Sequence, residues 1–454
     1  METNFCEKLR SHNETRQKTY FIKTYGCQMN SRESEGMSAI MRNCGFGPAS
    51  ALDVADVVLF NTCCVRESAE DKFFGHLGRM KPLKEKNREL VIVVSGCMSQ
   101  QEKIKGIIEK KHPYVDIVIG TGNRHFLPEF IFDVFNGRKR IFDTSGVDEM
   151  PPESSSTIRE YPHKAGVNIM YGCDNFCSYC IVPYVRGRER SRASGDIVNE
   201  VKSLAGDGVQ EIMLLGQNVN SYGKGLSGEG FSKLLHELSE IREIKRIRFM
   251  TSHPRDFSDE LIFAVRDLPK VCKHIHLPLQ AGSTKVLMDM NRGYTKERYL
   301  ELVSRINTWI PDVAITTDII VGYPGERDGD FFDTLDVVKK AGFASAFTFV
   351  YSKRSGTPAA IREDVVPADV VSARFKKLTD TLYPLMNDFN KKKVGSVFGC
   401  MVEEIDGESI KGRLDDHSLV HLTQPQENYL RPGDIVPVKI TDAKTFYLIG
   451  EQSV

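Results

Sequence analysis

The sequence predicts an α/β protein with an N-terminal parallel α/β domain, a central (β/α) partial barrel and a small C-terminal all-β barrel. Three observations lead to this prediction. The chain has 454 residues, which at about 150 residues per domain suggests three domains. Two series of strand-length apolar runs alternate with helical patterns, as in parallel sheets. From about Lys391 onward the pattern changes to short strands separated by turn signals such as Pro432-Gly433-Asp434.

Composition limits the protein class. Hydrophobic residues make up 41% and charged residues 27%, as in soluble globular proteins. Lys+Arg and Asp+Glu are both 61, so the protein does not have a basic, nucleic-acid-binding surface all round. Any contact with RNA must use a local basic patch. No apolar run approaches the ~20 residues of a membrane span, and residues 1–18 form a polar tail without the apolar core of a signal peptide. We therefore expect a cytoplasmic protein without a membrane partner.

The first α/β series is expected over residues 19–147. Strands are predicted at 20–25, 54–60 and 90–94, with helices at 31–44 and from about residue 67. A cysteine follows each strand directly, at Cys27, Cys63 and Cys97. In a parallel sheet the carboxyl ends of the strands lie along one edge, so these three thiols are expected to meet there. The alternative is that they are three inert core cysteines.

The segment 148–161 has the composition of a linker, with Pro151-Pro152 and Ser154-Ser155-Ser156. The second α/β series is expected over residues 162–388, with its active site at the C-terminal ends of the strands. The last domain is expected over residues 389–454. Six strands are predicted in the central series, at 168–170, 211–215, 246–250, 274–278, 314–321 and 346–351.

A Cys-x3-Cys-x2-Cys run, formed by Cys173, Cys177 and Cys180, follows the first strand of the central series. Three thiolates on one short loop can bind three irons of a cubane and leave the fourth iron open to another ligand. The alternative is zinc, but a structural zinc site is closed by four protein ligands, and no histidine follows Cys180 at a typical spacing. The spacing favours an iron–sulfur cluster.

This loop, together with Leu214–Val219 and Ile319–Glu326, resembles the radical S-adenosylmethionine superfamily. The resemblance implies a [4Fe-4S] cluster on Cys173, Cys177 and Cys180 whose open iron chelates S-adenosylmethionine. It also implies cofactor-side candidates near the strand ends, which are Gly216, Gln217, Asn218, Ser252, His276, Gln280 and Arg192.

Residues 23–30, 61–66 and 95–97 are similar to the N-terminal domain of the methylthiotransferase family. This similarity implies a second, auxiliary [4Fe-4S] cluster on Cys27, Cys63 and Cys97. In the family pattern the ligand directly follows Asn-Thr, which selects Cys63 over its neighbour Cys64. The remaining cysteines match no ligand position and are interpreted as structural or incidental.

Further stretches resemble the MiaB-type tRNA enzymes of that family, and the C-terminal barrel resembles a TRAM domain. The resemblance implies the conversion of N6-isopentenyladenosine to its 2-methylthio derivative at position 37 of tRNA, next to the anticodon. The expected partners are the tRNA anticodon arm and an external electron donor; the sulfur source is unknown, and a monomer is expected. The stretches are residues 61–67, 182–192, 251–254, 276–283 and 349–358.

Four arginines alternate at positions 186, 188, 190 and 192. In an extended segment this spacing places them on one face, where Arg186, Arg188 and Arg190 are candidates for RNA phosphates and Arg192 for the cofactor carboxylate. The alternative is a solvated surface. The C-terminal barrel itself, residues 394–454, carries five Lys/Arg against ten Asp/Glu, which is unfavourable for binding phosphates. Its aromatic residues Phe398, Tyr429 and Phe446 are interpreted as core in preference to base-stacking residues.

Three alternatives to this function remain open. The same chemistry has other acceptors, namely N6-threonylcarbamoyladenosine in tRNA or an aspartate of a ribosomal protein. A non-catalytic iron–sulfur RNA-binding protein would contain clusters but cleave no S-adenosylmethionine. A zinc-binding RNA module would be colourless.

Overall fold

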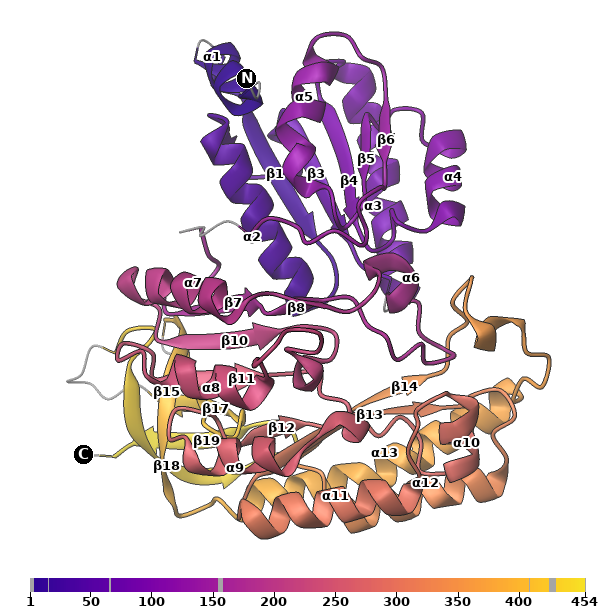
Figure 1. The fold of residues 1–454 in the computed structure, drawn as a ribbon, viewed down its shortest axis with the longest axis vertical. Coiled ribbons are helices and arrows are strands. Elements are labelled where there is room, and N and C mark those ends of the chain that lie inside the picture. The colour runs from indigo at the N-terminus through magenta and orange to yellow at the C-terminus, as the bar shows by residue number, and fades with distance from the viewer. Residues whose placement is uncertain are drawn as a thin grey trace. The chain divides into compact units, whose positions relative to one another are not determined.

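The computed structural model describes residues 4–14, 16–64, 67–153, 158–407, 409–423 and 430–453, and the chain forms two compact units (Figure 1). Unit 1 contains residues 1–160, 171–174 and 181–190; unit 2 contains residues 161–170, 175–180 and 191–454. Arg66 of the Asn-Thr-Cys motif, the linker residues Ser154-Ser155-Ser156 and Tyr429 lie outside the described residues. The finer boundaries expected from the sequence, at 147, 162 and 388, stay predictions.

Unit 1 is built on a six-stranded sheet in the order β2-β1-β3-β4-β5-β6, and all neighbouring pairs are parallel. The expected parallel α/β domain is confirmed. Its strands are β1 (Thr19–Thr24), β2 (Gly47–Pro48), β3 (Val57–Thr62), β4 (Val91–Gly96), β5 (Ile117–Ile119) and β6 (Ile141–Asp143). Its helices are α1 (Phe5–Asn13), α2 (Gln28–Asn43), α3 (Glu67–Lys86), α4 (Glu102–Lys111), α5 (Leu127–Phe135) and α6 (Val182–Arg186).

Both faces of this sheet are covered, which explains why its central strands are continuous apolar runs. Every residue of β3 and β4 is buried. One face packs on α3 and α4 through residues such as Phe73 and Ile108. The other face packs on α1, α2 and α5 through residues such as Met37 and Ile131. The carboxyl edge of the sheet is left for polar and thiol side chains.

The polar tail expected over residues 1–18 is wrong in its first part, which forms helix α1. The Asn4 side chain accepts a hydrogen bond from the Glu7 backbone N–H at 3.3 Å and so caps the helix. Leu9 is fully buried in the core of unit 1, and a disulfide joins Cys6 to Cys44 at the end of α2. The sequence does not indicate this helix because its three apolar residues, Phe5, Cys6 and Leu9, are too few to show a helical period in an otherwise polar stretch.

Unit 2 contains two three-stranded parallel sheets, β11-β10-β7 and β12-β13-β14. Ile247 of β11 forms a parallel bridge to Val271, just before β12, so the six strands follow one another as in a partial barrel. The fold class expected for the central series is confirmed. The strands are β7 (Lys164–Asn168), β10 (Glu211–Leu215), β11 (Arg246–Phe249), β12 (His274–His276), β13 (Ala314–Val321) and β14 (Ser345–Val350). Two short strands, β8 (Met170–Tyr171) and β9 (Arg190–Ser191), lie where the chain passes between the units.

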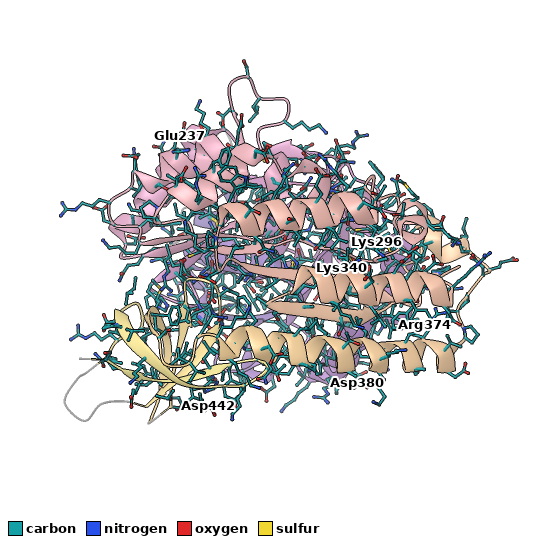
Figure 2. All side chains as sticks on the ribbon, turned by 90° about the horizontal axis from the view of Figure 1, so that it is seen from below. Glu237, Lys296, Lys340, Arg374, Asp380 and Asp442 are labelled. Atoms are coloured by element: carbon teal, nitrogen blue, oxygen red, sulfur yellow. A yellow bond between two sulfur atoms is a disulfide. The ribbon has the colours of Figure 1, made fainter. Side chains whose placement is uncertain are left out.

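Helices follow these strands on their outer side. They are α7 (Ser194–Gly206), α8 (Phe231–Ser239), α9 (Asp259–Asp267), α10 (Thr284–Asp289), α11 (Lys296–Trp309), α12 (Asp328–Ala341) and α13 (Ala368–Lys391). Figure 2 labels Lys296 on α11, Lys340 on α12 and Arg374 on α13. Lys296 binds Asp333 of α12 at 2.7 Å, and Arg374 binds Glu326 at 2.8 Å, so ion pairs join neighbouring elements of this layer.

The C-terminal residues of unit 2 form a closed barrel in the order β15-β16-β17-β19-β18, as the sequence predicts. The strands are β15 (Val397–Asp406), β16 (Ser409–Leu414), β17 (Leu419–Thr423), β18 (Ile435–Ala443) and β19 (Leu448–Gln452). Among the described residues, none of the helices is long and apolar enough to cross a membrane.

Buried polar contacts join this barrel to the six-stranded part of unit 2. Arg248 of β11 is 1% exposed; its Nε donates to Glu211 Oε2 at 2.9 Å. Its two terminal nitrogens donate to the carbonyls of Leu414 and Asp415, each at 2.8 Å. Lys393 is buried as well and binds Asp416 at 2.9 Å. The barrel therefore depends on charged side chains from the rest of the unit.

Replacing Arg248 with methionine should lower the free energy of unfolding by about 3–5 kcal/mol, because the buried Glu211 carboxylate would lose its hydrogen-bonded cation at 2.9 Å and keep only Arg246, at 4.0 Å. The matched control is Arg298→Met, since Arg298 pairs with Glu301 at 3.2 Å on the exposed face of α11 and should cost less than about 1 kcal/mol. Urea denaturation followed by circular dichroism measures both. Equal, small losses in the two variants would contradict the structural role of Arg248.

Candidate functional site

Cys27, Cys63 and Cys97 follow the carboxyl ends of three adjacent strands, β1, β3 and β4. Thr24 lies beside Asn61, and Thr62 lies beside Gly96, so the strands end in register. Cys27 precedes α2, Cys63 directly follows β3, and Cys97 directly follows β4. The sequence-based expectation that these cysteines share one edge of the sheet agrees with this topology. We call this group the auxiliary site.

Two glycines make this close approach of the cysteines possible. Gly26 has φ +112°, and a Cβ placed there would lie 2.2 Å from the Cβ of Cys63. Gly96 has φ +100°, and its Cβ would lie 2.3 Å from the Thr62 carbonyl oxygen. Only glycine adopts such a backbone without strain and leaves that space. The Gly-Cys pairs at 26–27 and 96–97 are therefore requirements of the fold at this edge.

Amide and hydroxyl side chains fix the loops that carry the thiols. Asn61 Nδ2 donates to the Asn30 carbonyl at 2.8 Å, and Asn30 Nδ2 donates to the Thr62 carbonyl at 3.0 Å. Thr62 Oγ1 donates to the Ser95 carbonyl at 2.6 Å, which links the ends of β3 and β4. The Asn-Thr of the motif thus orients Cys63. Sequence reasoning missed Asn30, whose position three residues after Cys27 in the first turn of α2 was the available signal.

Two of these thiols, Cys27 and Cys63, are in contact, and two of the three are buried. Cys63 is 1% exposed and Cys97 is 4% exposed, whereas Cys27 lies on the surface. A hydrogen bond with Cys63 and the positive charge of Arg186 lower the pKa of Cys27 to about 6. A hydrogen bond with Cys64, followed by the charge of Arg186, lowers the pKa of Cys97. Thiolate is the form that binds iron, so this donor set fits an iron–sulfur cluster.

A fourth thiol, Cys64, lies in the same place. It is buried, and its hydrogen bond with Cys97, together with burial, raises its pKa well above the ordinary value. Among the described residues, no three His, Cys, Asp or Glu side chains are grouped as ligands of a single metal ion. A [4Fe-4S] cluster distributes its cysteine ligands over separate irons, so it does not need such a grouping.

The four alternating arginines do not share one extended face, so that expectation is wrong. Arg186 ends helix α6 and binds Glu33, and Arg192 is buried and binds Glu200 at 2.7 Å. Arg190 donates to the carbonyls of Arg188 and Arg186. Arg188 is exposed and binds Asp174 at 2.8 Å. The helix breaks the period-two pattern because Pro183 and the apolar residues Val182 and Val185 begin a turn with a buried side.

The loop with Cys173, Cys177 and Cys180 follows β8. Gly172 has φ +76°, and a Cβ there would lie 2.0 Å from the Arg188 carbonyl oxygen. Within unit 1, the Cys173 backbone N–H donates to the Gly187 carbonyl at 3.2 Å. Within unit 2, the Cys180 N–H donates to the Cys177 carbonyl at 2.9 Å. The backbone is thus held tightly on both sides of the loop.

Side chains of unit 2 also hold the middle of this loop. Ser178 Oγ donates to the Asp289 carbonyl at 2.7 Å, and Asn291 Nδ2 donates to the carbonyls of Asn175 and Phe176, both at 3.1 Å. Arg292 is buried, and its Nη1 donates to Cys177 Sγ at 3.4 Å. Sequence reasoning missed Arg292, because no motif near it marks a contact with a loop more than a hundred residues away.

Buried polar atoms without a partner lie where β10 and β11 end in unit 2. Among the described residues, Asn218 Oδ1, Ser252 Oγ and His253 Nε2 are buried and have no hydrogen-bond partner. Burial first, then repulsion by Arg292 and Arg255, lowers the pKa of His253 to about 2, so the ring is neutral. Its Nδ1 accepts the Arg255 backbone N–H at 3.3 Å, which leaves the proton on Nε2. Polar atoms of this kind fit a polar ligand such as S-adenosylmethionine.

Other predicted cofactor-side residues lie near these strand ends but have partners. His276 shares a hydrogen bond with Thr316 Oγ1 at 3.0 Å and lies 3.4 Å from Asp318 Oδ2. Gln280 has φ +69°, and its backbone bonds to Asp318 and Ile320 of β13. Gly216 packs closely on Met170, since a Cβ there would lie 2.4 Å from Met170 Cγ. Gln217 is the second residue after the end of β10.

The aromatic residues of the C-terminal barrel differ in exposure. Phe398 packs against the barrel core, as expected, whereas the core interpretation of Phe446 is wrong, because Phe446 is 61% exposed. Its ring lies 5.3 Å from the ring of Tyr383. Phe446 also lines a cavity of about 220 Å³ within unit 2, together with Phe347 and His417.

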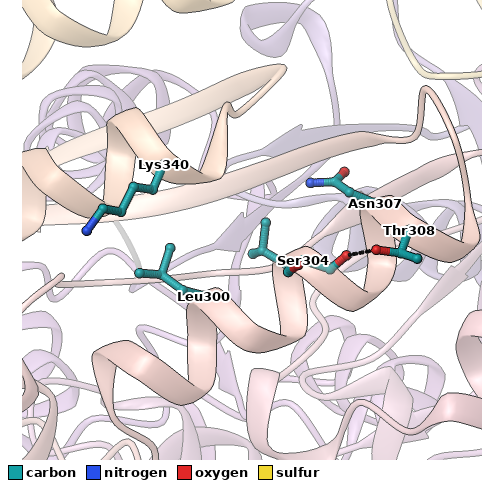
Figure 3. Close-up of a pocket in the computed structure, with 6 residues that line it drawn as sticks. Leu300, Ser304, Asn307, Thr308 and Lys340 are labelled. Atoms are coloured by element: carbon teal, nitrogen blue, oxygen red, sulfur yellow. Dashed lines mark hydrogen bonds between the residues drawn. The ribbon is translucent and has the colours of Figure 1, made fainter.

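A second cavity is not a candidate site. It has a volume of about 390 Å³ and lies between α11 and α12, where Leu300, Ser304 and Lys340 line it (Figure 3). Thr308 Oγ1 donates to the Ser304 carbonyl at 2.8 Å, so this hydroxyl is already used within α11. Its lining contains no thiol, carboxylate or histidine.

Comparisons with known proteins agree with this arrangement. Residues 19–120 match the model of "Uncharacterized protein family UPF0004", and residues 167–338 match the radical SAM superfamily. The tRNA-2-methylthio-N(6)-dimethylallyladenosine synthase of Clostridium tetani is 48% identical over 97% of this chain and 98% of its own length. That of Clostridium novyi is 49% identical over 96% of each chain.

The fold has solved counterparts as well. The radical S-adenosylmethionine methyltransferase TsrM from Kitasatospora setae, solved with cobalamin and a [4Fe-4S] cluster, superposes with a TM-score of 0.55 at 14% identity. The match covers 76% of this chain and 77% of that chain. At this identity the likeness concerns the fold alone.

Proposed function

The chain belongs to the family of tRNA-2-methylthio-N(6)-dimethylallyladenosine synthases, and from this premise we propose how its residues serve that activity. It is a radical S-adenosylmethionine enzyme that acts on tRNA and uses [4Fe-4S] clusters and S-adenosylmethionine. It adds a methylthio group to C2 of N6-isopentenyladenosine next to the anticodon. Membership of this family disfavours the two non-catalytic alternatives, namely an iron–sulfur RNA-binding protein and a zinc-binding RNA module.

The observation that carries the proposal is the pair of cysteine triads, one after three adjacent strands of unit 1 and one on a single loop. Cys27, Cys63 and Cys97 hold the auxiliary cluster, and Cys173, Cys177 and Cys180 hold the cluster that binds S-adenosylmethionine. When bound, these groups supply radical chemistry and a transferable sulfur, which a C–H bond without activation requires and amino-acid side chains alone do not provide.

The protein's own residues bind, orient and shield these groups. The burial of Cys63 and Cys97 keeps water away from two of the three thiolates that hold the auxiliary cluster. Ser252 Oγ and His253 Nε2 are available to hydrogen-bond the polar groups of S-adenosylmethionine. The target base must leave its stack to be reached, as in other enzymes that act on a base. Exposed Arg188 and Phe446 are our candidates for RNA contact, one for phosphate and one for stacking.

The partner and compartment assignments follow from the activity. We assign the tRNA anticodon arm as the macromolecular substrate and an external one-electron donor as the second partner. The cytoplasm, where tRNA is modified, is the assigned compartment, and a monomer is the assigned state.

The test is the iron, sulfide and zinc content of the anaerobically reconstituted protein, compared with a Cys27/Cys63/Cys97 triple-alanine variant. The expected result is about eight irons per chain falling to about four. Wild-type protein should then methylthiolate tRNA that carries N6-isopentenyladenosine, as measured by mass spectrometry of the nucleosides. Four irons in both proteins, or zinc instead of iron, would refute the two-cluster proposal.

A further inference from the structure

Arg186 is a buried cation in direct contact with a thiol of the auxiliary site. It is 4% exposed, and its Nε donates to Cys97 Sγ at 3.2 Å. Its two terminal nitrogens donate to the two oxygens of Glu33, at 2.7 Å and 3.2 Å. Each of the three guanidinium nitrogens therefore donates one hydrogen bond, two of them to a carboxylate and one to a sulfur.

Other buried charged side chains lie around this contact. Glu33 lies 3.5 Å from a second buried arginine, Arg124, which binds Glu153 at 2.8 Å. Arg186 is the member of this network that reaches a sulfur. Because the surroundings are buried, each of these charges acts on the thiol with little screening by water. Glu33 partly offsets the positive charge that Arg186 presents to Cys97.

The position of Arg186 in the chain explains how it reaches this place. It ends α6, which begins two residues after Cys180 and belongs to unit 1. The next residue, Gly187, has φ +72°, and its carbonyl accepts the Cys173 backbone N–H. Residues 186 and 187 thus contact one cysteine from each triad, both within unit 1.

We propose that Arg186 is a positioning residue that sets the reduction potential of the auxiliary cluster through its hydrogen bond to Cys97 Sγ, and that Glu33 moderates this effect. The inference rests on the proposed function, because it requires Cys97 to ligate that cluster. One-electron reduction adds a negative charge to the cluster and its thiolates. A donor and a positive charge at the sulfur stabilise that reduced form, so Arg186 raises the potential and Glu33 lowers it.

The test uses a protein in which Cys173, Cys177 and Cys180 are alanine, so that only the auxiliary cluster remains. Its midpoint potential is measured by anaerobic titration with dithionite, followed by electron paramagnetic resonance. Arg186→Met should shift the potential to more negative values, and Glu33→Gln should shift it to more positive values. Arg186→Lys keeps the positive charge but loses the planar guanidinium that donates to both groups. Its midpoint potential should lie between those of Arg186→Met and the parent.

Arg138→Met is the matched control for the loss of a surface cation in unit 1. Arg138 binds Asp133 at 2.9 Å on the exposed surface, where salt screens its charge. The Arg138→Met substitution should therefore leave the midpoint potential unchanged. A purely structural role for Arg186 predicts the same direction of shift, or none, in both Arg186→Met and Glu33→Gln, and that result would overturn the inference.

Two further outcomes are separated by iron analysis. If the parent protein holds no iron, the auxiliary cluster and the proposed function both fail before any potential is measured. If Arg186→Met alone loses its cluster, Glu33→Gln and Arg186→Lys decide the question, and an unshifted potential in Glu33→Gln counts against the inference.

Discussion

Replacing Cys177 with alanine is expected to abolish the cleavage of S-adenosylmethionine. Cys177 is the central cysteine of its loop, it is buried, and Arg292 donates a hydrogen bond to its sulfur. Without this thiolate the loop offers two ligands in place of three, and the cluster that supplies the electron is lost. We expect a loss greater than the ~100-fold that changes around a metal ligand cause.

The measurement is the amount of 5′-deoxyadenosine formed in the presence of dithionite, with iron content determined on the same sample. The iron content should fall from about eight to about four per chain, since the auxiliary cluster is untouched. Cys272→Ala is the matched control, because Cys272 is equally buried in unit 2 but matches no ligand position. Cleavage that survives in Cys177→Ala and is lost in Cys272→Ala would reverse our assignment.

The sequence is sufficient to predict several of the parallel strands. The predicted strands at 211–215 and 314–321 agree residue for residue with β10 and β13. Apolar runs of this length, bounded by glycine and polar turns, form buried parallel strands with little ambiguity. The strand before the second triad was placed too late, because β7 starts at Lys164 and its apolar residues alternate with a lysine and a glycine.

Residues that act through long-range contacts could not be predicted in this way. Glu33 lies 153 positions from Arg186, and Arg292 lies 115 positions from Cys177. Neither residue stands out locally, since Glu33 is one of several charged residues at the start of a helix. The roles of such side chains depend on which loops the fold brings together. This is also why the arginine alternation was misleading, because spacing describes a face only when the backbone conformation is known.

Cys63 and Cys64 are adjacent in the chain, so the choice of which thiol ligates the auxiliary cluster depends on their immediate surroundings. The two thiols have different neighbours. Cys63 lies against Gly26, in contact with Cys27, whereas Cys64 contacts Cys97. The hydrogen bond with Cys63 lowers the pKa of Cys27, and the hydrogen bond with Cys64 lowers that of Cys97, so each of the two neighbours pairs with one thiol of the auxiliary site. The family pattern, in which the ligand directly follows Asn-Thr, is what favours Cys63 as the ligand.

We therefore expect Cys63→Ala to lose methylthiolation of tRNA while it still cleaves S-adenosylmethionine, because the second triad is intact. Cys64→Ala should keep both activities and about eight irons, as a buried thiol that behaves as a small apolar side chain. Iron content, deoxyadenosine and modified nucleoside are measured on the two variants together. If Cys64→Ala loses about four irons and Cys63→Ala keeps them, the ligand is Cys64. In that case the contact between Cys64 and Cys97 would determine where the cluster binds, in spite of the family pattern.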